Sequence, residues 1–489
     1  MDTALPSRHF TGYVSVGAKN YSHLFYYLVE SEADVVKDPV VLWLTGGPGC
    51  SSLDAFIYEN GPFTFKSNPR ASEEEETELV PNPYAWSKAA TMIYVDSPVG
   101  SGMSYSTDPA GAPVMDDNST TANLLDFITQ LLSVQFPHLL GNDLYLAGES
   151  YAGVYIPLLA SKILDQNKAV DAHRRLKLQG YAIGNGVTDD YFDGQGQPEF
   201  AYAMGLIDPF TYTNLNAVCH SCFWNASRDS ACWKAKQDAY QDLTWLNAYD
   251  ILQDCFTDGK PPPSSVSSAP AISTDPADVT DSAHKDASFR RRLLQSNSLR
   301  SGQQGVKHGQ QLDTKSWQQS HRGADMQLQA GALASGWRGL VGHAVACSDR
   351  RVASKYLNRD VVRQALRLPS VAELEWQPCS DTLDYTLGPV ALVPTHRALL
   401  AAGLRVLVYS GDHDFVVPFT GTRAWVYSMK MEITQTYRPW TINGQVAGFA
   451  VKFKPGLVFA TVKGAGHMVP QTSPVAALHL FTRFLSNRL

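Results

Sequence analysis

Short apolar runs separated by polar or turn-forming residues recur along the first 190 residues of the chain. They are rich in Val, Leu, Ile, Tyr and Phe, which is typical of buried strands. The expected strands of this part lie at residues 25–29, 40–44, 92–96 and 143–148. Residues 121–136 instead carry apolar side chains at helical spacing. Alternation of strands and helices predicts an α/β fold with a mainly parallel sheet and helices on both faces.

The pattern changes twice after residue 205. Residues 205–257 are rich in Asn, Gln, Trp and Cys and show no strand pattern, so we expect short helices of an insertion. Residues 258–335 are dominated by Ser, Gln, Gly, Asp and Lys. Because such a segment buries too little apolar surface to offset its ordering entropy, it is predicted to be disordered. Arg290–Arg292 within it is either a protease-processing site or a solvated basic cluster.

Regular structure is expected again from about residue 350. The predicted elements are a helix at 360–368, strands at 405–409 and 457–462, and a closing helix at 476–485.

Composition narrows the function classes. A chain of 489 residues with 44% hydrophobic residues can bury a real core, and a net charge of −7 does not indicate nucleic acid or an anionic membrane as partner. The apolar runs are too short to span a membrane. Seven cysteines are too few for a disulfide framework, and the odd number leaves one unexplained. The spacings of common metal sites are absent, so neither a metal nor a cofactor is expected.

The segment Gly148-Glu-Ser-Tyr-Ala-Gly153 follows a predicted strand and precedes an apolar helical run. A strand, a sharp turn with Ser150 at its apex, and a helix form a nucleophile elbow. Small flanking residues let the strand and helix approach each other, and the helix N-terminus brings a partial positive charge close to Ser150. A single motif of this kind is weak evidence, so partners for the serine are needed.

Candidate partners follow the later strands. Asp412 and Asp414 come after the strand at 405–409, and His467 lies on a glycine-flanked loop after the strand at 457–462. The order Ser, Asp, His is that of a hydrolase triad on an α/β sheet. His413 is a competing base, although it lies on the acid's own loop. The glycines of Thr45–Cys50 directly follow a strand and could point backbone N–H groups at an oxyanion.

Together these segments resemble the serine carboxypeptidase family of α/β-hydrolases, in its plant and algal type. The matching motifs lie at residues 42–52, 58–63, 82–87, 95–105, 148–153, 183–186, 409–422 and 464–470. The resemblance implies an α/β-hydrolase fold with a mostly parallel central sheet and a helical cap insertion. The implied division is a first half of the core at 1–186, a helical cap at 187–257, a disordered linker and candidate processing site at 258–335, and the end of the insertion with the second half of the core at 336–489.

The resemblance also implies catalytic roles. Ser150 would be the nucleophile, His467 the general base and acid, and Asp414 the carboxylate that orients the histidine. Asp412 would then have a structural role. The backbone N–H groups of Gly47 and Tyr151 would form the oxyanion hole.

A substrate carboxylate site is implied at Thr45, Gly46, Glu59 and Glu149. Two adjacent carboxyls share a proton, and the protonated one can donate a hydrogen bond to a carboxylate. We therefore predict peptidase activity that is best at acidic pH; the alternative is a buried glutamate pair without a substrate role. The chain departs from the family at Thr45, where many of its peptidases have Asn, and at Gln471-Thr-Ser-Pro, where Asp-Gln-Pro is commoner.

Cysteine pairing is likewise implied by the resemblance. The expected bridges are Cys50–Cys379, Cys255–Cys347 and a third between Cys232 and either Cys219 or Cys222, with Cys222 taken as the candidate partner. Disulfides place a chain in the secretory pathway, in a vacuolar or lysosome-like compartment or outside the cell. Since the first residues contain no apolar segment of a signal peptide, we expect the precursor to carry one that is missing here. The sequons at Asn20, Asn118 and Asn225 are candidate glycosylation sites.

Three functions are therefore open. The first is a carboxypeptidase that acts on the C-termini of peptides and proteins through a Ser150 acyl-enzyme. The second is an acyltransferase of the same fold, and the third is a catalytically idle binding protein. No nucleic acid or membrane partner is expected, and the protein would be a monomer or a homodimer.

Overall fold

A computed structural model of the chain describes residues 5–66, 78–219, 223, 226, 230–240, 243, 246–254, 350–369 and 374–489. These described residues all belong to one compact unit. The predicted linker at 258–335, with Arg290–Arg292, lies outside them, and the proposed domain boundaries stay predictions.

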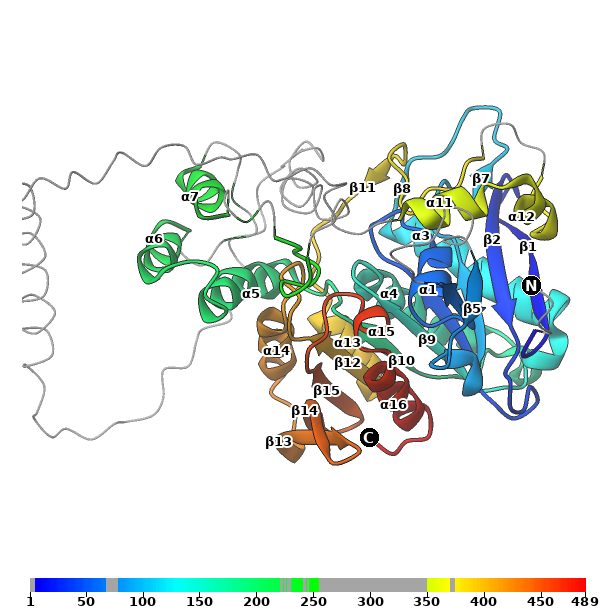
Figure 1. Ribbon diagram of the computed structural model, residues 1–489. Helices are drawn as coiled ribbons and strands as arrows, with labels where there is room; N and C mark the ends of the chain where they lie inside the picture. Colours follow the sequence, from blue (N-terminus) through cyan, green and yellow to red (C-terminus); the bar gives the residue numbers. More distant parts are fainter. Residues whose placement is uncertain are drawn as a thin grey trace, which may run out of the picture. The chain divides into compact units, whose positions relative to one another are not determined.

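Among the described residues, eleven strands form one sheet (Figure 1). They are β1 His9–Val16, β2 Ser22–Val29, β3 Val40–Leu44, β6 Thr91–Val95, β7 Tyr105–Ser106, β9 Leu144–Glu149, β10 Leu178–Gly184, β12 Arg405–Gly411, β13 Ile433–Ile442, β14 Gln445–Phe453 and β15 Leu457–Val462. The order is β1-β2-β6-β3-β9-β10-β12-β15-β14-β13, with β7 paired to β2. From β6 to β15 all neighbours are parallel, whereas the pairs at both edges are antiparallel. The mostly parallel sheet expected from the sequence is therefore confirmed.

Helices cover both faces of this sheet. They are α1 Ser52–Tyr58, α3 Asp117–Gln130, α4 Ala152–Ala169, α5 Asp190–Ala203, α6 Pro209–Cys219, α7 Ala231–Tyr240, α11 Arg351–Leu357, α12 Asp360–Ala365, α13 Val393–Ala401, α14 Phe419–Ser428, α15 Val469–Thr472 and α16 Pro474–Leu485. The shorter helical turns are η1 Trp86–Lys88, η2 Leu131–Gln135, η3 Pro137–Leu139 and η4 Ala172–Arg174, and two small sheets pair β4 Phe63–Phe65 with β5 Leu79–Pro81 and β8 Met115–Asp116 with β11 Tyr385–Thr386. Within the part of the chain that the structure describes, no helix is long and apolar enough to cross a bilayer.

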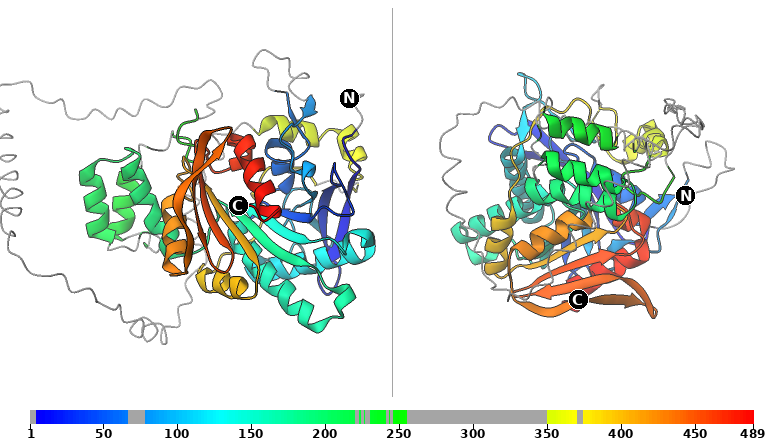
Figure 2. Two further views of the ribbon diagram at one scale, coloured as in Figure 1. Left: turned by 90° about the horizontal axis from the view of Figure 1, so that it is seen from below. Right: turned by 90° about the vertical axis from the view of Figure 1, so that its left-hand side faces the viewer.

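The central strands are mostly apolar because both of their faces are buried. In β3, alternate side chains point to opposite faces. Leu42 joins a cluster with residues of α3, α4 and α13, whereas Trp43 joins a second cluster with residues of α1, α11 and α16. In Figure 2 (left), α16 (red) lies on the upper side of the sheet, and the cyan and teal helices of the first half lie on its lower side. The sheet thus lies between two helical layers.

Several predicted elements are confirmed with small shifts. The strands at 40–44 and 457–462 have the expected bounds. The helix expected at 121–136 starts earlier, at Asp117, because Asp116 and Ser119 form a capping box. The hairpin of β13 and β14 was not predicted, because most of its side chains are exposed and carry no regular apolar alternation.

The predicted helical insertion is present as α5, α6 and α7. Its apolar cluster includes Phe200, Leu215 and Tyr240 together with Phe415, which follows β12. A disulfide joins Cys219, the last residue of α6, to Cys232 in the first turn of α7. The assignment of Cys222 as partner of Cys232 was therefore wrong.

Candidate active site

The turn between β9 and α4 holds Ser150 in a left-handed conformation, with φ +59°. Such a φ is unfavourable for a residue with a Cβ, and strain of this kind concentrates at functional sites. The Ser150 amide donates to the Gly184 carbonyl (3.1 Å), and its carbonyl accepts from the Gly153 amide (2.9 Å). A Cβ at Gly148 would collide with the Leu44 carbonyl oxygen, and one at Gly153 would collide with a carbonyl after β10. The glycine flanks are thus required by packing.

His467 and Asp414 come together on neighbouring loops after β15 and β12. Nδ1 of His467 lies 2.8 Å from Oδ2 of Asp414, and both side chains are buried. Since a carboxylate accepts only, Nδ1 carries the proton. The His467 amide donates to the Tyr249 carbonyl (2.6 Å), and the two rings meet edge to face. Nε2 of His467 has no hydrogen-bond partner among the described residues, and the ring lines the same cavity as Ser150.

Asn185 holds the carboxylate from behind, a role that was not predicted from the sequence. Its Nδ2 donates to Oδ2 of Asp414 (2.8 Å), and its Oδ1 accepts from the Gly411 amide (3.0 Å). The amides of Val416 and Val417 donate to Asp414 as well (2.8 and 3.1 Å). The motif at 183–186, which ends the strand next to β12, was the available signal.

The competing residues on this loop point elsewhere. Oδ1 of Asp412 accepts from the Gly464 amide (2.8 Å), which fastens the loop that carries His467. His413 lies 3.4 Å from Asp250 and 3.6 Å from Asp412, and it does not line the cavity that contains Ser150. Asp412 therefore has a structural contact, and His413 lacks access to the serine.

The loop after β3 lies directly against the elbow. A Cβ at Gly46 would lie 2.5 Å from the Tyr151 nitrogen and 2.6 Å from Cβ of Ser150, so only glycine leaves this amide open. Gly47 has a positive φ of 115°, a conformation that glycine adopts freely. The geometry therefore leaves room beside Ser150 for an oxygen that accepts hydrogen bonds from backbone N–H groups.

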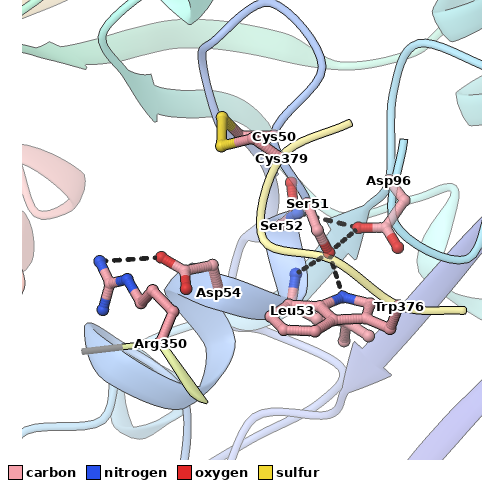
Figure 3. Close-up of a disulfide and its surroundings, with 9 residues drawn as sticks. All are labelled: Cys50, Ser51, Ser52, Leu53, Asp54, Asp96, Arg350, Trp376 and Cys379. Carbon is pink, nitrogen blue, oxygen red and sulfur yellow. Dashed lines mark hydrogen bonds and ion pairs between the residues drawn. A yellow bond between two sulfur atoms is a disulfide. The ribbon is translucent and has the colours of Figure 1, made fainter. Parts of the chain in front are cut away.

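The end of this loop is fixed covalently and by backbone pairing. The expected disulfide Cys50–Cys379 is confirmed (Figure 3). Beside it, the Ser51 amide donates to the Pro378 carbonyl (2.8 Å), and the Ser380 amide donates to the Gly49 carbonyl (2.9 Å). The other expected bridge, Cys255–Cys347, lies outside the described residues.

A buried polar network supports the start of α1. Asp96 accepts from Oγ of Ser51 (2.6 Å) and from the Ser52 amide (2.8 Å), and Oγ of Ser51 accepts from Nε1 of Trp376 (2.9 Å; Figure 3). Burial raises the pKa of Asp96 to about 6, although these hydrogen bonds oppose the rise. Asp96 belongs to the motif at 95–105, but its contacts with Ser51 and Ser52 depend on the folded chain.

Glu59 and Glu149 form a buried carboxyl pair beneath the cavity. Burial raises the pKa of Glu59 to about 8, and the neighbouring carboxyl of Glu149 opposes that rise. Burial, followed by the charge of Glu59, raises the pKa of Glu149 well above its ordinary value. Glu149 lines the cavity, whereas Glu59 is not among its lining residues. Near neutral pH the pair can therefore keep a proton and offer an O–H donor.

The cavity has a volume of about 80 Å³ and is lined by residues from both halves of the chain. Ser150, His467, Glu149, Gly46 and Gly47 all lie along it, as does Thr45. Oγ1 of Thr45 accepts from Nε1 of Trp43 (3.1 Å), which leaves its own hydroxyl hydrogen available as a donor.

Asp54 and Arg350 also line the cavity, and neither was predicted from the sequence. Nη2 of Arg350 lies 3.1 Å from Oδ2 of Asp54, and the guanidinium group lies 4.3 Å from the ring centre of Tyr58. Figure 3 shows this ion pair beside α1, on the opposite side from Asp96. Their juxtaposition depends on a contact between α1 and a segment almost 300 residues later.

Two of the candidate glycosylation sites lie on the surface. Asn20 and Asn118 are exposed, and Oδ1 of Asn118 accepts from Lys162 (2.8 Å). Asn225 lies outside the described residues.

Comparisons with known proteins agree with this geometry. A family model described as serine carboxypeptidase matches residues 1–487. The chain belongs to the serine carboxypeptidase family. It is 38% identical over 489 residues to serine carboxypeptidase 1 of Hordeum vulgare, covering 99% of this chain and 91% of that protein. It is also 35% identical over 485 residues to serine carboxypeptidase-like 21 of Arabidopsis thaliana, covering 98% of this chain and 91% of that protein.

A solved structure supports the fold of this serine carboxypeptidase family member. It is that of Kex1(delta)p, a prohormone-processing carboxypeptidase from Saccharomyces cerevisiae, with a TM-score of 0.66 and 20% sequence identity. The match covers 98% of this chain and 91% of that chain. The expected α/β-hydrolase fold is thereby confirmed.

Proposed function

We propose that the protein is a serine-type carboxypeptidase that removes C-terminal residues from peptides and proteins through a Ser150 acyl-enzyme. The observation that carries the proposal is one cavity lined by Ser150, His467 and the buried carboxyl Glu149. The first two supply a nucleophile and its base, and the third can bind a terminal carboxylate. Family membership supports this reading over an acyltransferase or an idle binding protein.

The acylation step follows from the positions of three side chains. Oγ of Ser150 attacks the scissile carbonyl carbon while its proton passes to Nε2 of His467, which has no other partner among the described residues. Asp414 stabilises the imidazolium through Nδ1. The oxyanion accepts hydrogen bonds from the amides of Gly47 and Tyr151.

Collapse of the tetrahedral intermediate breaks the C–N bond, and His467 returns its proton to the departing amine. A water molecule then gives a proton to His467 and attacks the ester carbon. Cleavage of the acyl–oxygen bond, with return of the proton from His467 to Oγ, regenerates Ser150 and releases the shortened peptide with a new C-terminal carboxylate.

Restriction to C-termini is attributed to the carboxyl pair and the loop after β3. An ionised glutamate repels a peptide carboxylate, whereas a protonated one donates a hydrogen bond to it. Glu149, with Glu59 beside it, donates this hydrogen bond. Gly46 and the hydroxyl of Thr45 provide further contacts to the substrate carboxylate. Activity should therefore be retained at acidic pH and decline once the pair ionises.

We further propose that the chain acts within the secretory pathway or outside the cell. The disulfides Cys50–Cys379 and Cys219–Cys232 persist in oxidising compartments. Exposure of Asn20 and Asn118 is compatible with glycan attachment there.

Hydrolysis of a blocked dipeptide with a free C-terminus tests the function, with Ser150→Ala as control. The wild type should release the terminal amino acid and react with a fluorophosphonate at Ser150, whereas the variant should do neither. A glucose ester added with an alcohol acceptor provides the acyltransferase arm. Transfer without peptide hydrolysis would reject the proposal.

A further inference from the structure

Arg350 is the one Lys or Arg among the described residues that line the cavity. Its side chain is only 11% exposed. Within the described part of the chain, its hydrogen-bonding contacts all use Nη2, which faces Oδ2 of Asp54 (3.1 Å) and Oε1 of Gln471 (3.4 Å). A guanidinium group has five N–H donors, and those on Nη1 and Nε donate to none of the described residues.

The charge of Arg350 acts on the groups around the cavity. Burial raises the pKa of Asp54, Glu59 and Glu149, and the positive charge of Arg350 opposes the rise in each case. The guanidinium is therefore close enough to the carboxyl pair to stabilise a negative charge there.

The charge balance of the cavity changes when a peptide C-terminus enters. Without ligand, Asp54 and Arg350 neutralise each other, and the glutamate pair keeps its proton. The cavity of about 80 Å³ has room for roughly five to eight water-sized groups, enough for a carboxylate but little bulk solvent. Because burying an unpaired carboxylate is costly, hydrogen-bond donors without a charge stabilise a bound carboxylate only weakly.

Asp54 is placed to exchange its partner. Its Oδ2 contacts Arg350, whereas its Oδ1 is buried without a hydrogen bond among the described residues. The aspartate therefore holds the guanidinium beside the cavity without satisfying its own carboxylate fully. A second carboxylate could share Arg350 without breaking a saturated network.

We propose that Arg350 binds the C-terminal carboxylate of the peptide, with Asp54 as the residue that positions it and competes with the substrate. The inference rests on the proposed carboxypeptidase function. It assigns a fixed positive charge to a site otherwise built from hydrogen-bond donors without a net charge.

The test compares Arg350→Gln with the wild type on two substrates of the same blocked amino acid. One is a dipeptide with a free C-terminus, and the other is an ethyl ester that lacks the carboxylate. Loss of a charge-assisted contact should raise KM for the dipeptide about 10- to 100-fold. Ester hydrolysis should stay within about twofold, because it needs only the catalytic serine and its partners.

Two further variants separate binding from a structural role. Asp54→Asn keeps the shape but removes the competing charge, so its KM for the dipeptide should fall below the wild-type value. Arg350→Lys keeps the positive charge and should bind better than Arg350→Gln. Thermal unfolding of all three variants shows whether the fold is kept.

If Arg350 served only to anchor α1 through Asp54, Arg350→Gln and Asp54→Asn would impair the hydrolysis of both substrates to the same extent. Both variants would also lower the stability of the protein to the same extent. That outcome overturns the inference, as does an unchanged KM in a folded Arg350→Gln variant. A wild type that hydrolyses the ester but releases no C-terminal residue rejects the proposed function instead. The two failures are therefore distinguishable.

Discussion

Nδ1 of His467 lies 2.8 Å from Oδ2 of Asp414, although the two residues are 53 positions apart in the chain. The same oxygen accepts a hydrogen bond from Asn185 at 2.8 Å. Asp414 is thus held by Asn185 and His467, which follow the two strands on either side of β12. Its position fixes the ring of His467. The orientation of His467 therefore depends on every group that donates a hydrogen bond to the Asp414 carboxylate.

Asn185→Ala should lower kcat/KM for peptide hydrolysis about 10- to 100-fold, because a hydrogen bond to a buried charged group is lost. Steady-state kinetics on a blocked dipeptide provide the measurement. Ser410→Ala is the control, since Oγ of Ser410 accepts from the same amide (3.1 Å) without touching Asp414. Equal losses in both variants would contradict the assigned role.

Gly46→Ala should lower kcat/KM by about 100-fold or more, which is the usual cost of losing an oxyanion donor. The added Cβ would lie 2.5 Å from the Tyr151 nitrogen. Gly388→Ala is the matched control, because a Cβ there has no neighbour within 4 Å among the described residues. Near-normal activity of a folded Gly46→Ala variant would argue against an oxyanion hole at Tyr151.

The buried carboxyl pair predicts how peptide binding depends on pH. Glu59, with a pKa raised to about 8, is neutral below that value and ionises as the pH rises through it. KM for peptides should therefore rise above about pH 8, whereas KM for an ethyl ester should not. A pH series of KM for both substrates provides the measurement.

Glu59→Gln sharpens this test, because Gln donates a hydrogen bond at every pH. The rise of KM above about pH 8 should become smaller in this variant. Glu199→Gln serves as the control, since Glu199 is exposed and faces Arg423 (3.6 Å). A wild-type optimum above about pH 8, or identical pH profiles of both variants, would reject the shared proton.

Removal of the disulfide Cys50–Cys379 in a double Ser variant should destabilise the protein by about 2–5 kcal/mol, as for bridges that close long loops. It should also lower kcat/KM, because the bridge anchors the loop that carries Gly46 and Gly47. Removal of Cys219–Cys232, which lies between α6 and α7, should leave ester hydrolysis intact. Calorimetry measures the stability of both variants, and kinetics measure their activity. Identical losses of activity would contradict the different roles of the two disulfides.

Local patterns predicted much of the core and the nucleophile turn. The strand at 40–44 is buried at every position and the strand at 457–462 at all but one, so a nearly continuous apolar run identified them. The turn around Ser150 was predictable because the glycines that permit it lie within three residues of the serine. Order along the chain then offered His467 with either Asp412 or Asp414, and the family resemblance singled out Asp414.

Contacts that exist only in the folded chain could not be predicted from the sequence. Asp96 and Asn185 act through segments that meet across the sheet, and the pair of Asp54 and Arg350 joins distant parts of the sequence. The choice between Cys219 and Cys222 depended on where α6 ends, which the polar composition there does not determine.

Mass spectrometry of a peptide digested in ¹⁸O-labelled water tests the central claim most directly. The account predicts successive products that each lack one more C-terminal residue, with heavy oxygen in every new terminal carboxyl and no reaction by Ser150→Ala. Cleavage at internal bonds, or the same products from Ser150→Ala, would contradict it.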